Sequence, residues 1–112
     1  HAANQQITSF EQLDDACWGV YIVEDTQTSY WREFKDRPNG ETFISYSAKL
    51  IDRLHEWHPN NSSIAIHRIP PTKRSSEPAV SKFCRTTKSI TFVDGMVVFE
   101  KGVNPPRYAQ VR

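Results

Sequence analysis

Residues 90–99 read ITFVDGMVVF, two apolar runs joined by Asp94 and Gly95. An Asp-Gly pair between apolar runs favours a two-residue hairpin turn. The turn sets these strand pairs: Val93 with Met96, Phe92 with Val97, and Ile90 with Phe99. We therefore expect an antiparallel hairpin whose core face carries Ile90, Phe92, Val97 and Phe99.

Further strands are predicted before the hairpin. Trp18, Val20 and Ile22 alternate with Tyr21 and Val23, so residues 19–24 present two apolar faces and favour a central strand. Aromatic residues favour a second strand over residues 28–35. Other strands are predicted over residues 64–69 and 81–87, and residues 41–46 favour a strand or a strand-to-helix transition.

Two helices are predicted. Apolar residues at the spacing of one helical face indicate a helix over residues 47–57, which Pro59 ends. Overlapping capping boxes that begin at Thr8 and Ser9 predict a shorter helix close to the N-terminus. We expect residues 1–7 to be loose and the proline- and serine-rich residues 70–80 to form an exposed loop.

The order of these elements predicts one domain over residues 1–112. A chain of 112 residues with 38% apolar content can form one core. Six or seven short strands separated by turns favour a mainly β fold, an antiparallel β-sandwich or partial barrel with one or two short helices. The alternative is a sheet with the helix packed across one face.

Composition excludes some classes of function. The net charge is +1, so no strong overall field attracts nucleic acid, and no apolar run is long enough to cross a membrane. The first residues, His1-Ala2-Ala3, fit either a remnant of signal cleavage or residues left by cloning. Cys17 and Cys84 are the only cysteines; we expect them to form a disulfide in an oxidising compartment, and the alternative is two buried free thiols.

The sequence holds no clear catalytic or metal-binding pattern. His55 and His58 lie three residues apart, one short of the spacing in the His-Glu-x-x-His zinc motif, so we predict no metal site. The glycines are isolated, which excludes a phosphate-binding loop, and no cofactor is expected. A ribonuclease-like hydrolase would need Glu24, His67 and Arg85 to meet. The tryptophans leave a carbohydrate-binding sandwich as another alternative.

The whole chain resembles rust-fungus secreted effectors, the group that includes avirulence proteins detected by coiled-coil immune receptors of wheat. The resemblance rests on chain length, the Cys17 and Cys84 pair, the aromatic strand WGVYIV at residues 18–23, and the segment FEKG at residues 99–102. It implies a cupin-like or carbohydrate-binding-module-like β-sandwich without catalytic residues. It further implies secretion, delivery to the host cytoplasm or nucleus, and binding as a monomer to an immune receptor and a host target protein.

A recognition surface is predicted at the end of the final hairpin. Continuing the register places Lys88 opposite Lys101, where like charges repel and folding stability gives no reason for the pair. Both lysines are expected at the rim, where a long side chain reaches water, with Glu100 pointing the other way. Together with the resemblance, this predicts that Lys101, Glu100 and Lys88 contribute to receptor recognition.

Overall fold

The computed structural model describes residues 2–14, 16–58 and 80–106. In these residues three strands form one antiparallel sheet. Its strands are β1 (Gly19–Glu24), β2 (Thr87–Val93) and β3 (Met96–Lys101), in the spatial order β1-β3-β2. The last of the described strands in the sequence is therefore the central one. Gly19 pairs with Lys101 and Glu24 with Met96 along the contact between β1 and β3.

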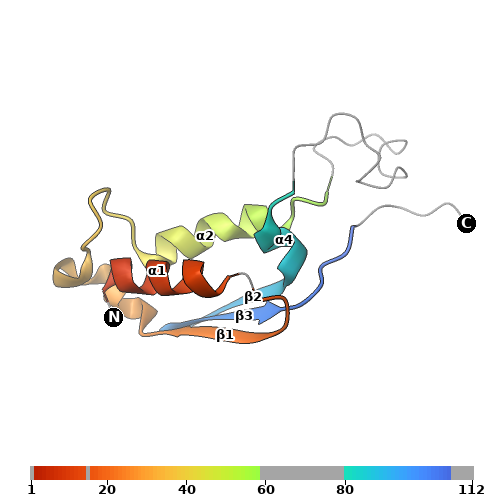
Figure 1. The fold of residues 1–112 in the computed structure, drawn as a ribbon. Helices are drawn as coiled ribbons and strands as arrows, with labels where there is room; N and C mark the ends of the chain where they lie inside the picture. The colour runs from red at the N-terminus through yellow and green to blue at the C-terminus, as the bar shows by residue number, and fades with distance from the viewer. Residues whose placement is uncertain (1, 15, 59–79, 107–112) are drawn as a thin grey trace, which may run out of the picture.

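Helices cover one face of this sheet. The two long helices are α1 (Ala3–Leu13) and α2 (Phe43–Leu54), which lie on the same side of the strands (Figure 1). Thr42 caps α2 in a reciprocal capping box with Ser45. The short helix α4 (Lys82–Thr86) leads into β2, and two 3₁₀ turns, η1 (Thr26–Tyr30) and η2 (Arg32–Phe34), follow β1.

The core lies between the helices and the sheet. It consists of the following buried apolar residues: Ile7, Phe10, Val23, Phe43, Leu50, Phe83, Val97 and Phe99. Phe10 of α1 stands against Phe99 of β3, with ring centroids 4.5 Å apart. Phe43 and Phe83 meet the same Phe99 ring edge-on, so rings from three helices converge on one strand residue.

The predicted β-sandwich is wrong. The described residues form one sheet with helices on a single face, an arrangement close to the predicted alternative, and no second sheet. The apolar alternation in residues 19–24 suggested burial on both faces. Only one face is covered, however, because Val23 is buried while Val20 and Ile22 are 64% and 49% exposed.

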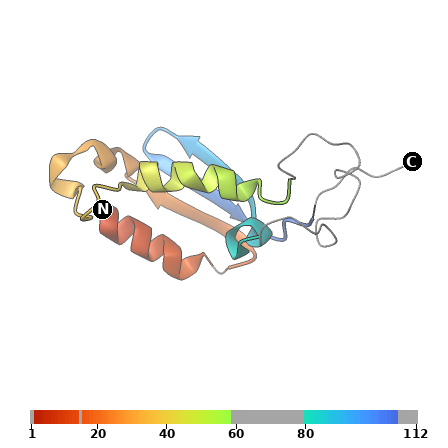
Figure 2. The same ribbon diagram turned by 90° about the horizontal axis from the view of Figure 1, so that it is seen from above.

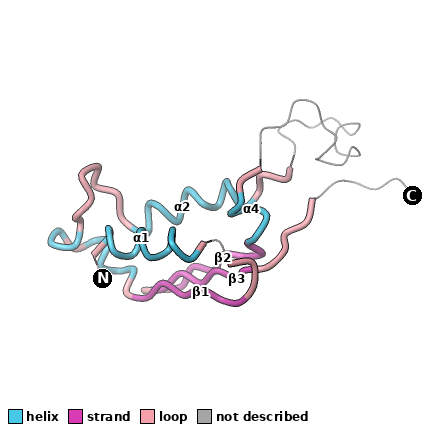
Figure 3. Tube along the Cα trace, in the orientation of Figure 1, coloured by secondary structure: helices cyan, strands magenta, loops and turns pink. Residues whose placement is uncertain are grey.

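Two predicted strands are helical instead (Figure 3). Asp25 adopts a left-handed conformation with φ 57°, and bonds from Thr28 and Trp31 to residues three positions earlier wind residues 28–35 into 3₁₀ turns. Ser81 accepts a hydrogen bond from the Cys84 amide at 3.2 Å and starts α4 where a strand was expected.

The predicted helices exist, with different bounds. Helix α1 begins at Ala3, so residues 3–7 are helical and the expected caps Thr8 and Ser9 lie inside the helix. Of the two options predicted for residues 41–46, the transition to helix is the closer, because α2 begins at Phe43 and ends at Leu54. The predicted strand 64–69 and all but one residue of the predicted loop 70–80 lie outside the described residues. None of the described helices is long and apolar enough to span a bilayer.

The predicted hairpin is confirmed in its register: Val93 pairs with Met96, Phe92 with Val97, and Ile90 with Phe99. Its predicted core face is only partly correct. Val97 and Phe99 are fully buried and Ile90 is half-buried, but Phe92 lies near the turn and is 44% exposed. The burial of β2 therefore decreases toward the turn.

Candidate functional site

Lys101 lies in the interior rather than at the rim. Its ammonium group donates to the Asp14 carboxylate at 2.9 Å and to the Thr87 hydroxyl at 2.7 Å, and it stands 4.9 Å from the centre of the Phe83 ring. The lysine side chain is 2% exposed and the Asp14 side chain is 25% exposed. The prediction that Lys101 reaches water is therefore wrong, because the residue joins the end of β3 to the end of α1.

The other two residues of the predicted recognition surface are exposed. A register shift between Thr87 and Ser89 takes Lys88 out of the ladder, so that Thr87 rather than Lys88 faces Lys101. Glu100 points away from the helices and accepts a hydrogen bond from the Ser89 hydroxyl at 3.3 Å. The three predicted residues therefore do not form one continuous surface. A bulge of this kind has no signal in residue type alone.

The two cysteines are free thiols in this structure, and the disulfide expected under oxidising conditions stays a prediction. Cys17 is exposed after α1, whereas Cys84 is buried in α4. The Cys84 sulfur lies 3.6 Å from the Leu54 carbonyl and 3.7 Å from the Asn104 amide nitrogen. Burial raises the pKa of the Cys84 thiol, which keeps it in its unreactive protonated form.

This difference predicts selective alkylation. In the folded protein we expect iodoacetamide at pH 8 to modify Cys17 and to spare Cys84, because only the thiolate of an accessible thiol reacts. Intact-mass spectrometry should show one adduct in buffer and two adducts in denaturant. Two adducts at equal rates in buffer would contradict the buried position of Cys84.

A pocket of about 200 Å³ opens where α2 ends, lined by Leu54, His55, Trp57, His58, Lys88 and Asn104. The Trp57 indole N–H donates to the Asn104 carbonyl at 2.8 Å and closes its floor. His55 Nδ1 lies 2.7 Å from the Ile51 carbonyl. No group of three or more histidine, cysteine or acidic side chains suited to a metal ion occurs within the described ranges.

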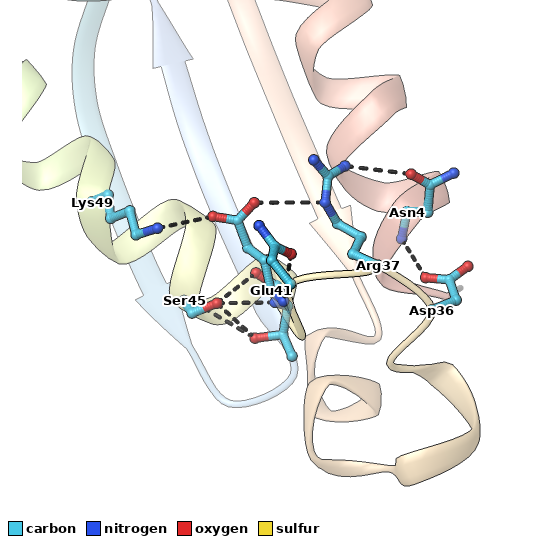
Figure 4. Close-up of polar contacts among 8 residues, drawn as sticks. Asn4, Asp36, Arg37, Glu41, Ser45 and Lys49 are labelled. Carbon is cyan, nitrogen blue, oxygen red and sulfur yellow. Dashed lines mark hydrogen bonds and ion pairs between the residues drawn. The ribbon is translucent and has the colours of Figure 1, made fainter.

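A polar network ties the loop before α2 to both long helices (Figure 4). Asp36 accepts from the Asn4 amide at 2.7 Å, and Arg37 donates to the Asn4 side chain at 3.3 Å. Glu41 then bridges Arg37 at 3.6 Å and Lys49 at 3.0 Å. These bonds are mostly exposed, so their main effect is to fix the loop against the start of α1.

The uncovered face of the sheet carries several exposed apolar residues. Trp18 precedes β1 and is 80% exposed, and Val20, Ile22 and Val93 are also about half exposed or more. Half-buried Met96 and Val98 of the central strand lie between them. Contiguous apolar surface of this kind usually marks an interface, which makes this face a candidate binding surface.

Comparison with known proteins finds similarity to methyltransferases. No protein-family model matches the chain. A Streptomyces olivaceus enzyme, 8-demethyl-8-alpha-L-rhamnosyl tetracenomycin-C 2'-O-methyltransferase, is 34% identical over 77 residues, which are 67% of this chain and 19% of that enzyme. The chain therefore spans about a fifth of the length of this curated relative.

Solved structures show the same likeness. The MycE methyltransferase from the mycinamycin biosynthetic pathway, in complex with Mg and SAH, superposes with a TM-score of 0.69 at 22% sequence identity. The superposition covers 96% of this chain and 25% of the MycE chain. A complex that also holds mycinamycin VI gives a TM-score of 0.64 and covers 24% of that chain. The chain therefore shares the fold of about one quarter of MycE.

These similarities correct the functional predictions. The predicted non-enzymatic effector, with its carbohydrate-binding and ribonuclease-like alternatives, is wrong, because the similar proteins are methyltransferases. The predicted cupin-like sandwich is wrong for the same reason. The resemblance to rust-fungus effectors, the expected partners and the expected location stay predictions.

Proposed function

We propose that the chain works as one structural unit of an O-methyltransferase that transfers a methyl group from S-adenosylmethionine to a sugar hydroxyl. The observation that supports it is the 34% identity with the Streptomyces olivaceus 2'-O-methyltransferase over 67% of this chain. In such a reaction a bond forms between the hydroxyl oxygen and the methyl carbon. The bond from that carbon to the sulfonium sulfur breaks, and the hydroxyl proton passes to a base.

The described residues do not fit a binding site for S-adenosylmethionine. Nucleotide-type cofactors usually bind beyond the carboxyl ends of parallel strands, next to a glycine-rich turn. The three described strands are all antiparallel, and the four glycines of the chain are isolated. We therefore assign no step on the methyl donor to these side chains.

A Mg²⁺ site does not fit them either. This ion takes oxygen ligands in near-octahedral geometry, usually with carboxylates among them. In residues 2–14, 16–58 and 80–106 the acidic side chains do not gather into a group that could hold a metal ion. We therefore propose a structural role for the described residues. They hold the uncovered sheet face and the helix layer in fixed positions within the enzyme.

A chimaera tests the proposal. The region of the Streptomyces olivaceus enzyme that aligns with this chain is replaced by residues 1–112, and S-adenosylhomocysteine release is measured with the rhamnosylated acceptor. We expect the chimaera to methylate at a rate comparable with the parent and the enzyme lacking the region to be inactive. A chimaera that melts like the parent but releases no S-adenosylhomocysteine would contradict the proposal.

A further inference from the structure

The outer edge of β1, on the side away from β3, is a candidate position for a further strand. Strand β1 pairs with β3 on one side, and none of the described strands pairs with its other side. Seen from above, α1 lies beyond β1 on the side away from β3 (Figure 2). The helix therefore extends past the β1 edge of the sheet, where none of the described strands lies beneath it.

A crevice occupies the space between this helix and the strand edge. It measures about 210 Å³ and is lined by Gln5, Gln6 and Ser9 of α1 and by residues 21–24 of β1. Strands in a sheet lie about 4.8 Å apart, so a further strand beside β1 would run along this crevice, below α1. The α1 side of the crevice is polar but uncharged, which suits a polypeptide backbone.

The side chain of Gln6, from α1, lies at the Glu24 end of this edge. Gln6 is 6% exposed, and its side-chain nitrogen donates to the Glu24 carbonyl at 3.0 Å, as the N–H of a neighbouring strand would. Its side-chain oxygen is buried and accepts no hydrogen bond from any described residue. A buried acceptor without a partner destabilises the fold, and a donor that enters the crevice would remove this cost.

We propose that the β1 edge accepts an extended segment of another polypeptide as a fourth strand, which runs beneath α1 and provides a donor for the Gln6 side-chain oxygen. The sheet dictates the pattern of this segment. Residues beside Val20 and Ile22 are apolar, because they extend the uncovered apolar face. The residues between them are small or polar, because they face Gln5 and Ser9.

A second copy of the chain is a poor occupant. Pairing β1 with β1 around a two-fold axis would bring the partner's own α1 to the same edge. Both helices lie beyond their strands and would compete for one space (Figure 2). A single extended segment brings no helix with it. A fourth strand would be accepted here whether or not the protein takes part in methyl transfer.

The test uses random linear peptides displayed on phage and selected against the folded protein. We expect enriched sequences with alternating apolar residues. A synthetic peptide of the enriched sequence should shift the amide NMR signals of Tyr21, Ile22 and Val23. Failure to enrich any sequence, or a peptide that instead shifts the signals of His55 and Asn104, would overturn the proposal.

Three variants sharpen the test. Two variants, Ser9→Arg and Gln5→Arg, place a large side chain in the crevice and should abolish peptide binding. Gln5 is at an exposed position. Thr8→Arg adds the same charge to α1 at an exposed position outside the crevice and should bind like the wild type. Equal binding by all three variants would overturn the proposal, as would a wild-type dimer in sedimentation velocity that Gln5→Arg dissociates.

Discussion

Replacing Phe99 with alanine should lower the free energy of unfolding by about 3–5 kcal/mol. Phe99 is fully buried in the central strand, and its ring contacts Phe10 of α1, Phe43 of α2 and Phe83 of α4. The substitution removes the one ring that all three helices share. The resulting cavity cannot close unless the helices move toward the sheet. Urea denaturation followed by tryptophan fluorescence measures the loss.

Phe92→Ala is the matched control for this prediction. Phe92 sits in the neighbouring strand but is 44% exposed, so its truncation removes little buried surface. We expect it to lower the free energy of unfolding by about 1 kcal/mol, in proportion to the apolar area withdrawn from water. Equal losses for the two variants would mean that the core does not centre on β3.

The second large effect is expected from Asp14→Ala, which should cost about 3 kcal/mol. The substitution leaves the Lys101 ammonium buried with only the Thr87 hydroxyl and the Phe83 ring as partners. A buried charge without its counter-ion is more costly than the pair itself is stabilising. Lys101→Met should cost less, because Asp14 is one quarter exposed and water can hydrate its carboxylate.

Glu100→Ala provides the control for this pair. Glu100 is exposed in the same strand, next to Lys101, and we expect a change below about 0.5 kcal/mol in the free energy of unfolding. Thermal melting of the four proteins at equal salt concentration gives the ranking. If Asp14→Ala and Glu100→Ala melt together, the bond between Asp14 and Lys101 contributes nothing measurable to stability.

The hairpin could be predicted from the sequence because its signal is local. Asp94 and Gly95 specify a turn, and a turn of known length fixes the register of the residues next to it. The same reasoning failed beyond Ser89, where the shift next to Thr87 moves Lys88 out of the ladder. The length of a turn therefore predicts the strand pairs only as far as the first irregularity in the strand.

Residues 19–24 present two apolar faces, which predicts a central strand that is buried on both sides. Val20 and Ile22 follow the pattern of a central strand, yet they lie on an edge strand and face away from the helices. A sequence pattern reports which side chains suit burial, but it does not say whether a partner is present to bury them. Trp31 is a similar case. It was predicted to lie in a strand, but it follows a 3₁₀ turn and is 47% exposed.

The buried position of Lys101 could not be predicted from its neighbours in sequence. Its acidic partner lies 87 residues earlier, at the end of α1, and the contact exists only after the sheet has formed. The uncovered sheet face and the crevice beside β1 are also products of tertiary structure. Only the apolar residues that line the face left a signal in the sequence.

The position of β3 at the centre of the sheet has a consequence for synthesis on the ribosome. β1 is made well before its hydrogen-bonding partner, residues 96–101. Until those residues have left the ribosome, β1 lacks β3, its one partner among the described strands, and Val20, Ile22 and Val23 stay open to nascent or neighbouring chains. Non-local pairing of this kind is slow and prone to aggregation. We therefore expect the yield of folded protein in cells to depend strongly on chaperones that hold residues 19–24 until residues 96–101 have left the ribosome.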